Sequence, residues 1–218
     1  MSRLREAGKA ALLLGGCAVL AVGLLAAVHA LTRERIVAAE HRKELATLAT
    51  VLPRGLYDND PVADVVSVSA PAWLGSNAPV TVRRARRNGA PAALVLPVVA
   101  SGYAGPIRML VGVSAEGRVL GARVVAHQET PGLGDWIEAG RSDWIDGFSG
   151  RALGDPPLPQ WRVRADGGVF DQFAGATVTP RAVVAALARA LHYVRAHGAA
   201  VFAAPTGASL SHHDEPRS

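Results

Sequence analysis

The chain has 218 residues, half of them hydrophobic, with a formal net charge of +5 and a single cysteine. This length allows one sizeable folded core and a membrane anchor, whereas one cysteine excludes an intrachain disulfide and a cysteine-held iron–sulfur cluster. The basic residues are not interleaved with aromatic ones, so the charge fits a protein at an anionic membrane and argues against nucleic acid as a partner.

An apolar run at residues 10–31 is the first element, and His29 is its only polar side chain. As a helix it spans about 33 Å, close to the thickness of the bilayer's hydrocarbon core. The alternative is a signal peptide cleaved near residues 28–30, but the apolar core of such peptides is only about 7–15 residues long. We therefore predict an uncleaved transmembrane helix. Basic residues flank it on both sides, so the positive-inside rule gives no orientation.

A helical pattern continues over residues 32–52, and Pro53 and Gly55 end it. We interpret this segment as a helical stalk or as the first helix of a soluble domain. The soluble domain itself is predicted at residues 53–203, with a first strand near residues 62–68.

Two pairs of extended runs indicate β-hairpins in this domain. Residues 80–87 and 90–100 flank an Asn-Gly dipeptide at 88–89, and residues 107–114 and 118–126 flank a short turn that contains glycine. Helical patterns follow the hairpins without a β-α-β repeat. We therefore predict an α+β fold, with an antiparallel sheet and flanking helices.

Four arginines crowd the first hairpin: Arg83, Arg84, Arg86 and Arg87. One interpretation is a docking patch for an acidic partner. The other is the solvated face of an edge strand. The pattern alone leaves both open.

The last long helical pattern covers residues 181–197. Thr179 is a predicted N-cap, Pro180 suits the first helical position, and Gly198 is a predicted stop. The segment 204–218 is rich in small and polar residues, so we predict a disordered tail.

The stretch just before this helix carries the candidate chemistry. Gly175 and Ala176 form a small-residue turn that presents two hydroxyls, those of Thr177 and Thr179. Free N–H groups and the dipole at a helix N-terminus favour an anion, and a glycine lets a bulky group approach the backbone. This layout suits a nucleotide linked through a phosphoester, whereas a simple helix cap is the alternative for either threonine.

The sequence Asp-x-x-x-Gly-Ala-Thr at 171–177, followed by Val-Thr-Pro-Arg at 178–181, resembles the flavinylation motif of an FMN-binding domain family. The family includes the G subunit of the Rnf (Rsx) ion-translocating oxidoreductase complex and, more distantly, the C subunit of the sodium-translocating NADH–quinone reductase. The resemblance implies that a flavin transferase joins the phosphate of FMN to Thr177. The family usually has serine or threonine where this chain has Ala174.

A second motif, Glu-Thr-Pro-Gly-Leu-Gly at 129–134, strengthens the resemblance, because in this family the corresponding loop lies beside the flavin. Without the first motif, this sequence would be explained equally well as a tight connection from a strand to a short helix. With both motifs, the predicted cofactor-binding residues, all for FMN and none for a metal, are Glu129, Thr130, Leu133, Gly134, Gly175, Ala176, Thr177 and Thr179.

The resemblance also implies a function and a topology. The chain would be an electron-carrier subunit, not a stand-alone enzyme, of a complex that couples electron transfer between ferredoxin and NAD to ion translocation. Residues 1–9 would be cytoplasmic, and the large domain would lie on the periplasmic side of the inner membrane with the other subunits as partners. The alternatives are the flavin subunit of another respiratory complex, such as the sodium-translocating reductase, or a cofactor-free bitopic scaffold.

Overall fold

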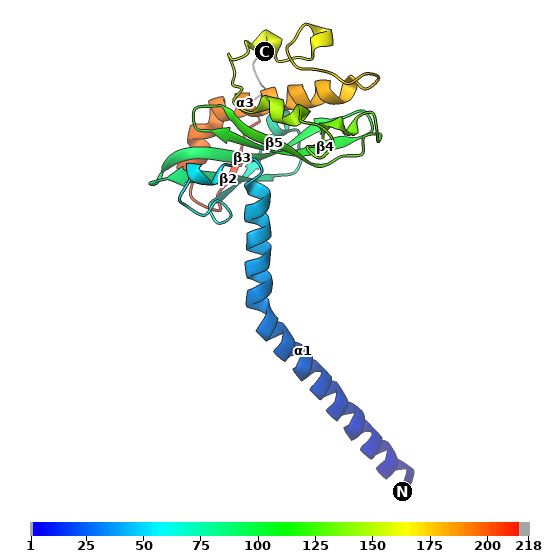
Figure 1. Cartoon of the computed structure of the whole chain (residues 1–218). Coiled ribbons are helices and arrows are strands. Elements are labelled where there is room, and N and C mark those ends of the chain that lie inside the picture. Colours follow the sequence, from blue (N-terminus) through cyan, green and yellow to red (C-terminus); the bar gives the residue numbers. More distant parts are fainter. Residues whose placement is uncertain (1, 214–218) are drawn as a thin grey trace. The chain divides into compact units, whose positions relative to one another are not determined.

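A computed structural model of the chain describes residues 2–213 (Figure 1). The chain divides into two compact units, residues 1–44 and residues 45–218. Helix α1 (Ser2–Leu48) runs through the first unit, and its last turn belongs to the second, which contains every other element.

The apolar part of α1 has no partner within the described residues. Leu12, Leu20 and Leu31 each expose more than 70% of their surface. By length and composition this helix is able to cross a membrane. The apolar run and the segment predicted as a stalk are one continuous helix that ends at Leu48, four residues before the predicted end.

A six-stranded sheet organises the second unit, in the order β5-β4-β3-β2-β1-β6. Neighbours from β1 to β5 are antiparallel, as the sequence predicted, and β6 pairs in parallel with β1. The strands are β1 (Val65–Ser69), β2 (Val80–Arg87), β3 (Ala90–Ser101), β4 (Pro106–Ser114), β5 (Val119–Ala126) and β6 (Ser209–Ser211).

Helix α3 (Val178–Ala203) covers one face of this sheet (Figure 1). The remaining helices are short: α2 (Pro71–Leu74), which the sequence had not predicted, and the 3₁₀ turns η1 (Arg54–Leu56), η2 (Asp135–Ile137), η3 (Trp144–Phe148), η4 (Leu158–Gln160) and η5 (Arg164–Asp166). The α+β prediction is confirmed.

Successive side chains of β3 point to opposite faces of the sheet, and a hydrophobic core lies on each face. Leu94 and Leu96 face the large core that α3 closes, whereas Val95 between them joins a smaller core with Leu48 and Leu52. All five side chains are at most 1% exposed, so the end of α1 and the chain after it are held against the sheet.

The Asn-Gly hairpin is confirmed. Asn88 and Gly89 both have positive φ, 51° and 77°, as a two-residue type I′ turn requires. The turn joins β2 to β3, and these strands form the antiparallel pair that the sequence predicted.

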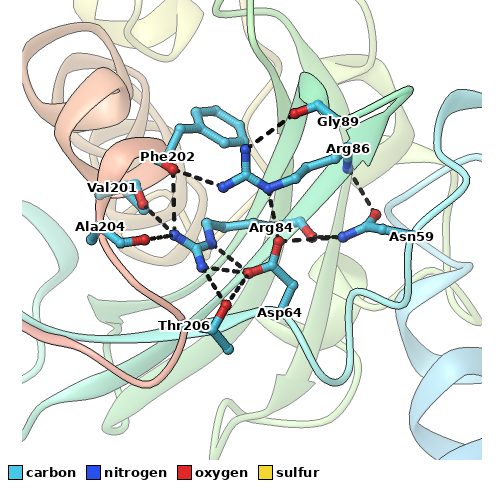
Figure 2. A network of polar contacts seen from close by, with 9 residues as sticks. All are labelled: Asn59, Asp64, Arg84, Arg86, Gly89, Val201, Phe202, Ala204 and Thr206. Carbon is cyan, nitrogen blue, oxygen red and sulfur yellow. Dashed lines mark hydrogen bonds and ion pairs between the residues drawn. The ribbon is translucent and has the colours of Figure 1, made fainter.

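Neither interpretation of the arginine cluster holds for Arg84 and Arg86. Arg84 is 1% exposed and donates from Nε to Oδ1 of Asp64 over 2.8 Å, while Arg86 donates from Nε to Oδ2 of the same carboxylate over 2.9 Å. Figure 2 shows both arginines reaching the end of α3, where they bind the carbonyls of Val201, Phe202 and Ala204. The two side chains form a buried network, because the short loop before β1 supplies an anion that the hairpin pattern does not reveal.

This network explains where α3 ends. The sequence predicted a stop at Gly198, but Gly198 is buried inside the helix, which continues to Ala203. Its missing side chain accommodates Val194 Cγ1, which would lie 3.3 Å from an added Cβ. The last carbonyls are satisfied by Arg84 from β2, a long-range cap instead of a local glycine.

The prediction of a disordered tail from residue 204 is wrong for residues 204–213. Gly207 N donates to Val65 O over 2.8 Å, and His212 N donates to Ser69 O over 2.8 Å, so the tail adds β6 to the open edge of β1. Residues 214–218 of the predicted tail lie outside the described residues.

Candidate functional site

One pocket is lined by all eight residues predicted from the two motifs. Its cavity measures about 240 Å³. Three segments form it: the β3–β4 turn, the loop at 129–134 that follows β5, and the start of α3. Two further residues line it that the sequence analysis did not name, Tyr103 and Val178.

The loop at 129–134 is folded by its own backbone. The N–H groups of Leu133 and Gly134 both donate to Thr130 O over 3.1 Å, and Gly132 N donates to Asp135 Oδ1 over 2.8 Å. Gly132 has a φ of 77°, which a residue with a side chain rarely adopts. These bonds curl the loop into one wall of the pocket.

The turn before α3 forms the opposite wall. Gly175 has a φ of 75°, and the nearest atom to an added Cβ is Leu133 Cδ2 at 3.8 Å. Thr177 stands at the N-cap position with φ −66° and ψ −26°, and its side chain makes no capping hydrogen bond. Its half-buried side chain therefore lies next to the first N–H groups of the helix without capping them.

The prediction that Thr179 caps the helix is wrong. Thr179 lies inside α3, is 1% exposed, and donates its hydroxyl to Oε2 of Glu129, which is 5% exposed. The other oxygen of this carboxylate accepts a hydrogen bond of 3.0 Å from Ala104 N in the β3–β4 turn. Glu129 therefore joins all three segments of the pocket.

A histidine behind the pocket fixes the backbone at Glu129. Glu129 N donates to His127 Nδ1 over 3.0 Å, and His127 Nε2 lies 2.6 Å from Oε1 of Glu138. Because Nδ1 accepts, we assign the ring proton to Nε2, which donates to the carboxylate of Glu138.

An ion pair braces the first turn of α3 from outside. Arg181 donates to both oxygens of Asp166, over 2.6 and 2.8 Å. The hydrogen bonds and charge of Arg181 hold the pKa of Asp166 below its usual range. This two-pronged contact ties η5 to the first turn of α3, which follows Thr177.

The mouth of the pocket has an exposed apolar rim. Tyr103 is 75% exposed, and Leu133, Trp136 and Val178 are each 43–44% exposed. Trp136 donates to Gly132 O over 3.3 Å, so it lies beside the loop wall. The position of Tyr103 between Gly102 and Ala104 in a turn is the sequence signal that could have identified it, because a large aromatic residue has no core to fill there.

The other tryptophans support the structure. Trp161 is 4% exposed and lies in the main core. Trp144 donates to Asp171 O over 2.9 Å and packs edge-on to Phe173, with ring centroids 5.2 Å apart, so it holds the segment of the motif that leads to the pocket.

Comparison with known proteins identifies the family. Residues 102–192, which include every residue that lines the pocket, match the model of the FMN-binding domain, and residues 1–51 match the RnfG N-terminal region. The G subunit of the ion-translocating oxidoreductase complex of Pseudomonas aeruginosa (strain UCBPP-PA14) is 52% identical over 86% of this chain and 88% of its own length. The chain belongs to the family of Rnf-type G subunits.

Other relatives of the same description agree. The G subunit of Cereibacter sphaeroides (strain ATCC 17023) is 48% identical over 88% of this chain and 86% of its own, and that of Vibrio cholerae (strain O395) is 43% identical over 87% and 90%. The crystal structure of Shewanella oneidensis NqrC matches with a TM-score of 0.46 and 23% identity, covering 69% of this chain and 74% of that one. The family that the motifs resembled is confirmed, and with it an FMN-binding domain at residues 102–192.

Proposed function

We propose that this chain is a membrane-anchored electron carrier of an Rnf-type complex and that it holds FMN through a phosphoester to Thr177. The observation that carries the proposal is the hydroxyl of Thr177, which makes no capping hydrogen bond at the start of α3 and lies on the wall of a pocket inside the FMN-binding domain. The other motif threonine, Thr179, already donates its hydroxyl to Glu129 and is buried.

The residues of the pocket fit the two ends of FMN. Open N–H groups and the positive end of the dipole of α3 favour the phosphate, and Gly175 leaves space beside Thr177. The apolar rim, which includes Tyr103 and Leu133, suits a flat aromatic ring. A cavity of about 240 Å³ is smaller than the roughly 300–1,000 Å³ of typical ligand pockets, so part of the cofactor would rest on this rim.

In this arrangement the chain would bind the cofactor, orient it and determine the polarity of its environment. Thr177 Oγ1 would form a bond to phosphorus while the bond from that phosphorus to the leaving group of the transferase's flavin donor breaks, and the hydroxyl proton would pass to the leaving group. The product then equals the chain plus FMN less one water. The bound flavin supplies the electron-transfer chemistry. The backbone at Gly175 and the start of α3 would orient the phosphate, and the rim would leave the ring accessible to a redox partner.

The proposed location follows from α1 and from the family. The exposed apolar helix would cross the inner membrane once, with residues 1–9 in the cytoplasm. The second unit would then be periplasmic, where a flavin transferase modifies it and where it passes electrons to other subunits. Those subunits would hold the ferredoxin and NAD sites and share ion translocation.

Four variants test the attachment residue, each expressed as the full chain in a host that has the flavin transferase. Thr177→Ala should abolish flavin fluorescence in a denaturing gel, and Thr177→Ser should keep it, since the ester needs only a hydroxyl. Thr130→Ala and Thr179→Ala, which each remove another hydroxyl from the same pocket, should also stay fluorescent. Fluorescence that persists in Thr177→Ala, or disappears only in Thr130→Ala, would show that another residue carries the flavin.

A further inference from the structure

A carboxylate with no cation is buried in the wall of the pocket. Glu129 is 5% exposed, yet its partners are both neutral: the hydroxyl of Thr179 at Oε2 and the N–H of Ala104 at Oε1, 3.0 Å away. Within residues 2–213, no lysine, arginine or histidine forms an ion pair with it.

Each oxygen of this carboxylate accepts one hydrogen bond. A carboxylate only accepts hydrogen bonds, and both oxygens of Glu129 receive one from a donor. The N–H of Ala104 donates to Oε1, and hydrogen bonds from donors to a charged carboxylate stabilise the charge. The site therefore holds a negative charge without placing a positive side chain beside it.

The carboxylate is also fixed in position. A Cβ added at Gly134 would lie 2.8 Å from both Cβ and Oε2 of Glu129, and one added at Gly102 would collide with Oε1. The bond from Glu129 N to His127 Nδ1 holds the backbone from the other side. Because the backbone at Gly134 and Gly102 packs closely against it, the carboxylate has little room to move when the charge in the pocket changes.

We propose that Glu129 is a fixed negative charge that lowers the reduction potential of the flavin in this pocket; the proposal rests on the proposed function. Each electron delivered by a redox partner brings negative charge into the pocket wherever a proton does not accompany it. A buried carboxylate opposes this charge more strongly than an exposed one, because the surrounding protein screens it less than water does. Glu129 thus acts as a positioning and tuning residue and not as the site of attachment.

The test compares reduction potentials in the full flavinylated chain at pH 8, where proton uptake is least complete. Glu129→Gln keeps the shape and removes the charge, and Glu129→Met removes the charge with an apolar side chain of similar length. Each should favour flavin reduction by tenfold or more, an upward shift of at least about 30 mV for a two-electron couple. Glu116→Gln makes the same chemical change in the β4–β5 turn, outside the pocket, and should leave the potential unchanged.

A second readout needs no flavin. In chain made without the transferase and labelled with ¹³C at glutamate, the signal lost in Glu129→Gln should show an ionised carboxylate at pH 7. A protonated group at that pH overturns the proposal, as does a potential in both variants that equals that of Glu116→Gln. Folded variants at Glu129 that take up no flavin also count against it, since tuning does not require attachment. Wild-type chain that takes up no flavin would instead contradict the proposed function and leave the ionised state of Glu129 as a separate result.

Discussion

Asp64→Asn should destabilise the soluble domain strongly, because it removes the carboxylate that pairs with Arg84 and Arg86. In the folded domain Asp64 accepts hydrogen bonds from Arg84, Arg86 and Thr206. Arg84 is 1% exposed, so the substitution would leave a buried guanidinium with only neutral partners. Asparagine has the same size, so the change alters charge without opening a cavity.

The size of the effect follows from burial. Breaking a buried ion pair on one side costs about 3–5 kcal/mol. The side chain of Asp64 is 16% exposed, and Arg84 keeps its contacts to carbonyls at the end of α3, so the lower end of that range applies, about 3 kcal/mol. At a urea slope of about 2 kcal/mol per molar, the unfolding midpoint should fall by about 1.5 M.

Tryptophan fluorescence during urea unfolding measures this directly, because all four tryptophans lie outside α1. Asp155→Asn is the matched control, since Asp155 pairs with Arg118 on the surface, where both side chains are more than half exposed. A midpoint for Asp64→Asn within the scatter of this control would refute the claim that the network holds the end of α3.

The remaining predictions concern pH, the pocket wall and topology. Burial opposes the charge of Asp64, but hydrogen bonds from Arg86, Arg84 and Thr206 outweigh it and keep its pKa below the usual range. Its contribution to stability is therefore complete above pH of about 4 and lost as pH falls through the lowered value, so urea midpoints should drop below pH 4 in wild type and less in Asp64→Asn. Thr179→Val should lower stability by about 2 kcal/mol in the same assay, because buried Glu129 loses a donor; an unchanged midpoint would contradict that contact. A reporter fused after the last residue should be active in the periplasm, and cytoplasmic activity would overturn the proposed orientation.

Features with a local cause were predictable from the sequence. A two-residue type I′ turn needs positive φ at two consecutive residues, and Asn-Gly is the dipeptide that adopts this most readily. Asn88 and Gly89 therefore identified the hairpin. The apolar run of α1 depends only on composition. The two motifs, read through the family they resemble, named eight residues that the fold brings to one pocket.

Features with a distant cause were not predictable in the same way. A threonine before a proline looks like a helix cap, but Thr179 bonds to Glu129, which lies 50 residues earlier. Gly198 looks like a helix stop, but Arg84 provides the cap from β2. The tail has no apolar alternation, and it becomes β6 because β1 offers an unpaired edge. In each case the partner comes from another element, and single-sequence patterns do not record that pairing.

The mass of the intact chain tests the central claim most directly. Chain purified from a host with the flavin transferase should be heavier than the sequence by one FMN less one water. Peptide fragmentation should place the added mass on Thr177, and Thr177→Ala from the same host should have the unmodified mass. An unmodified wild-type chain, or the same added mass on Thr177→Ala, would contradict the account.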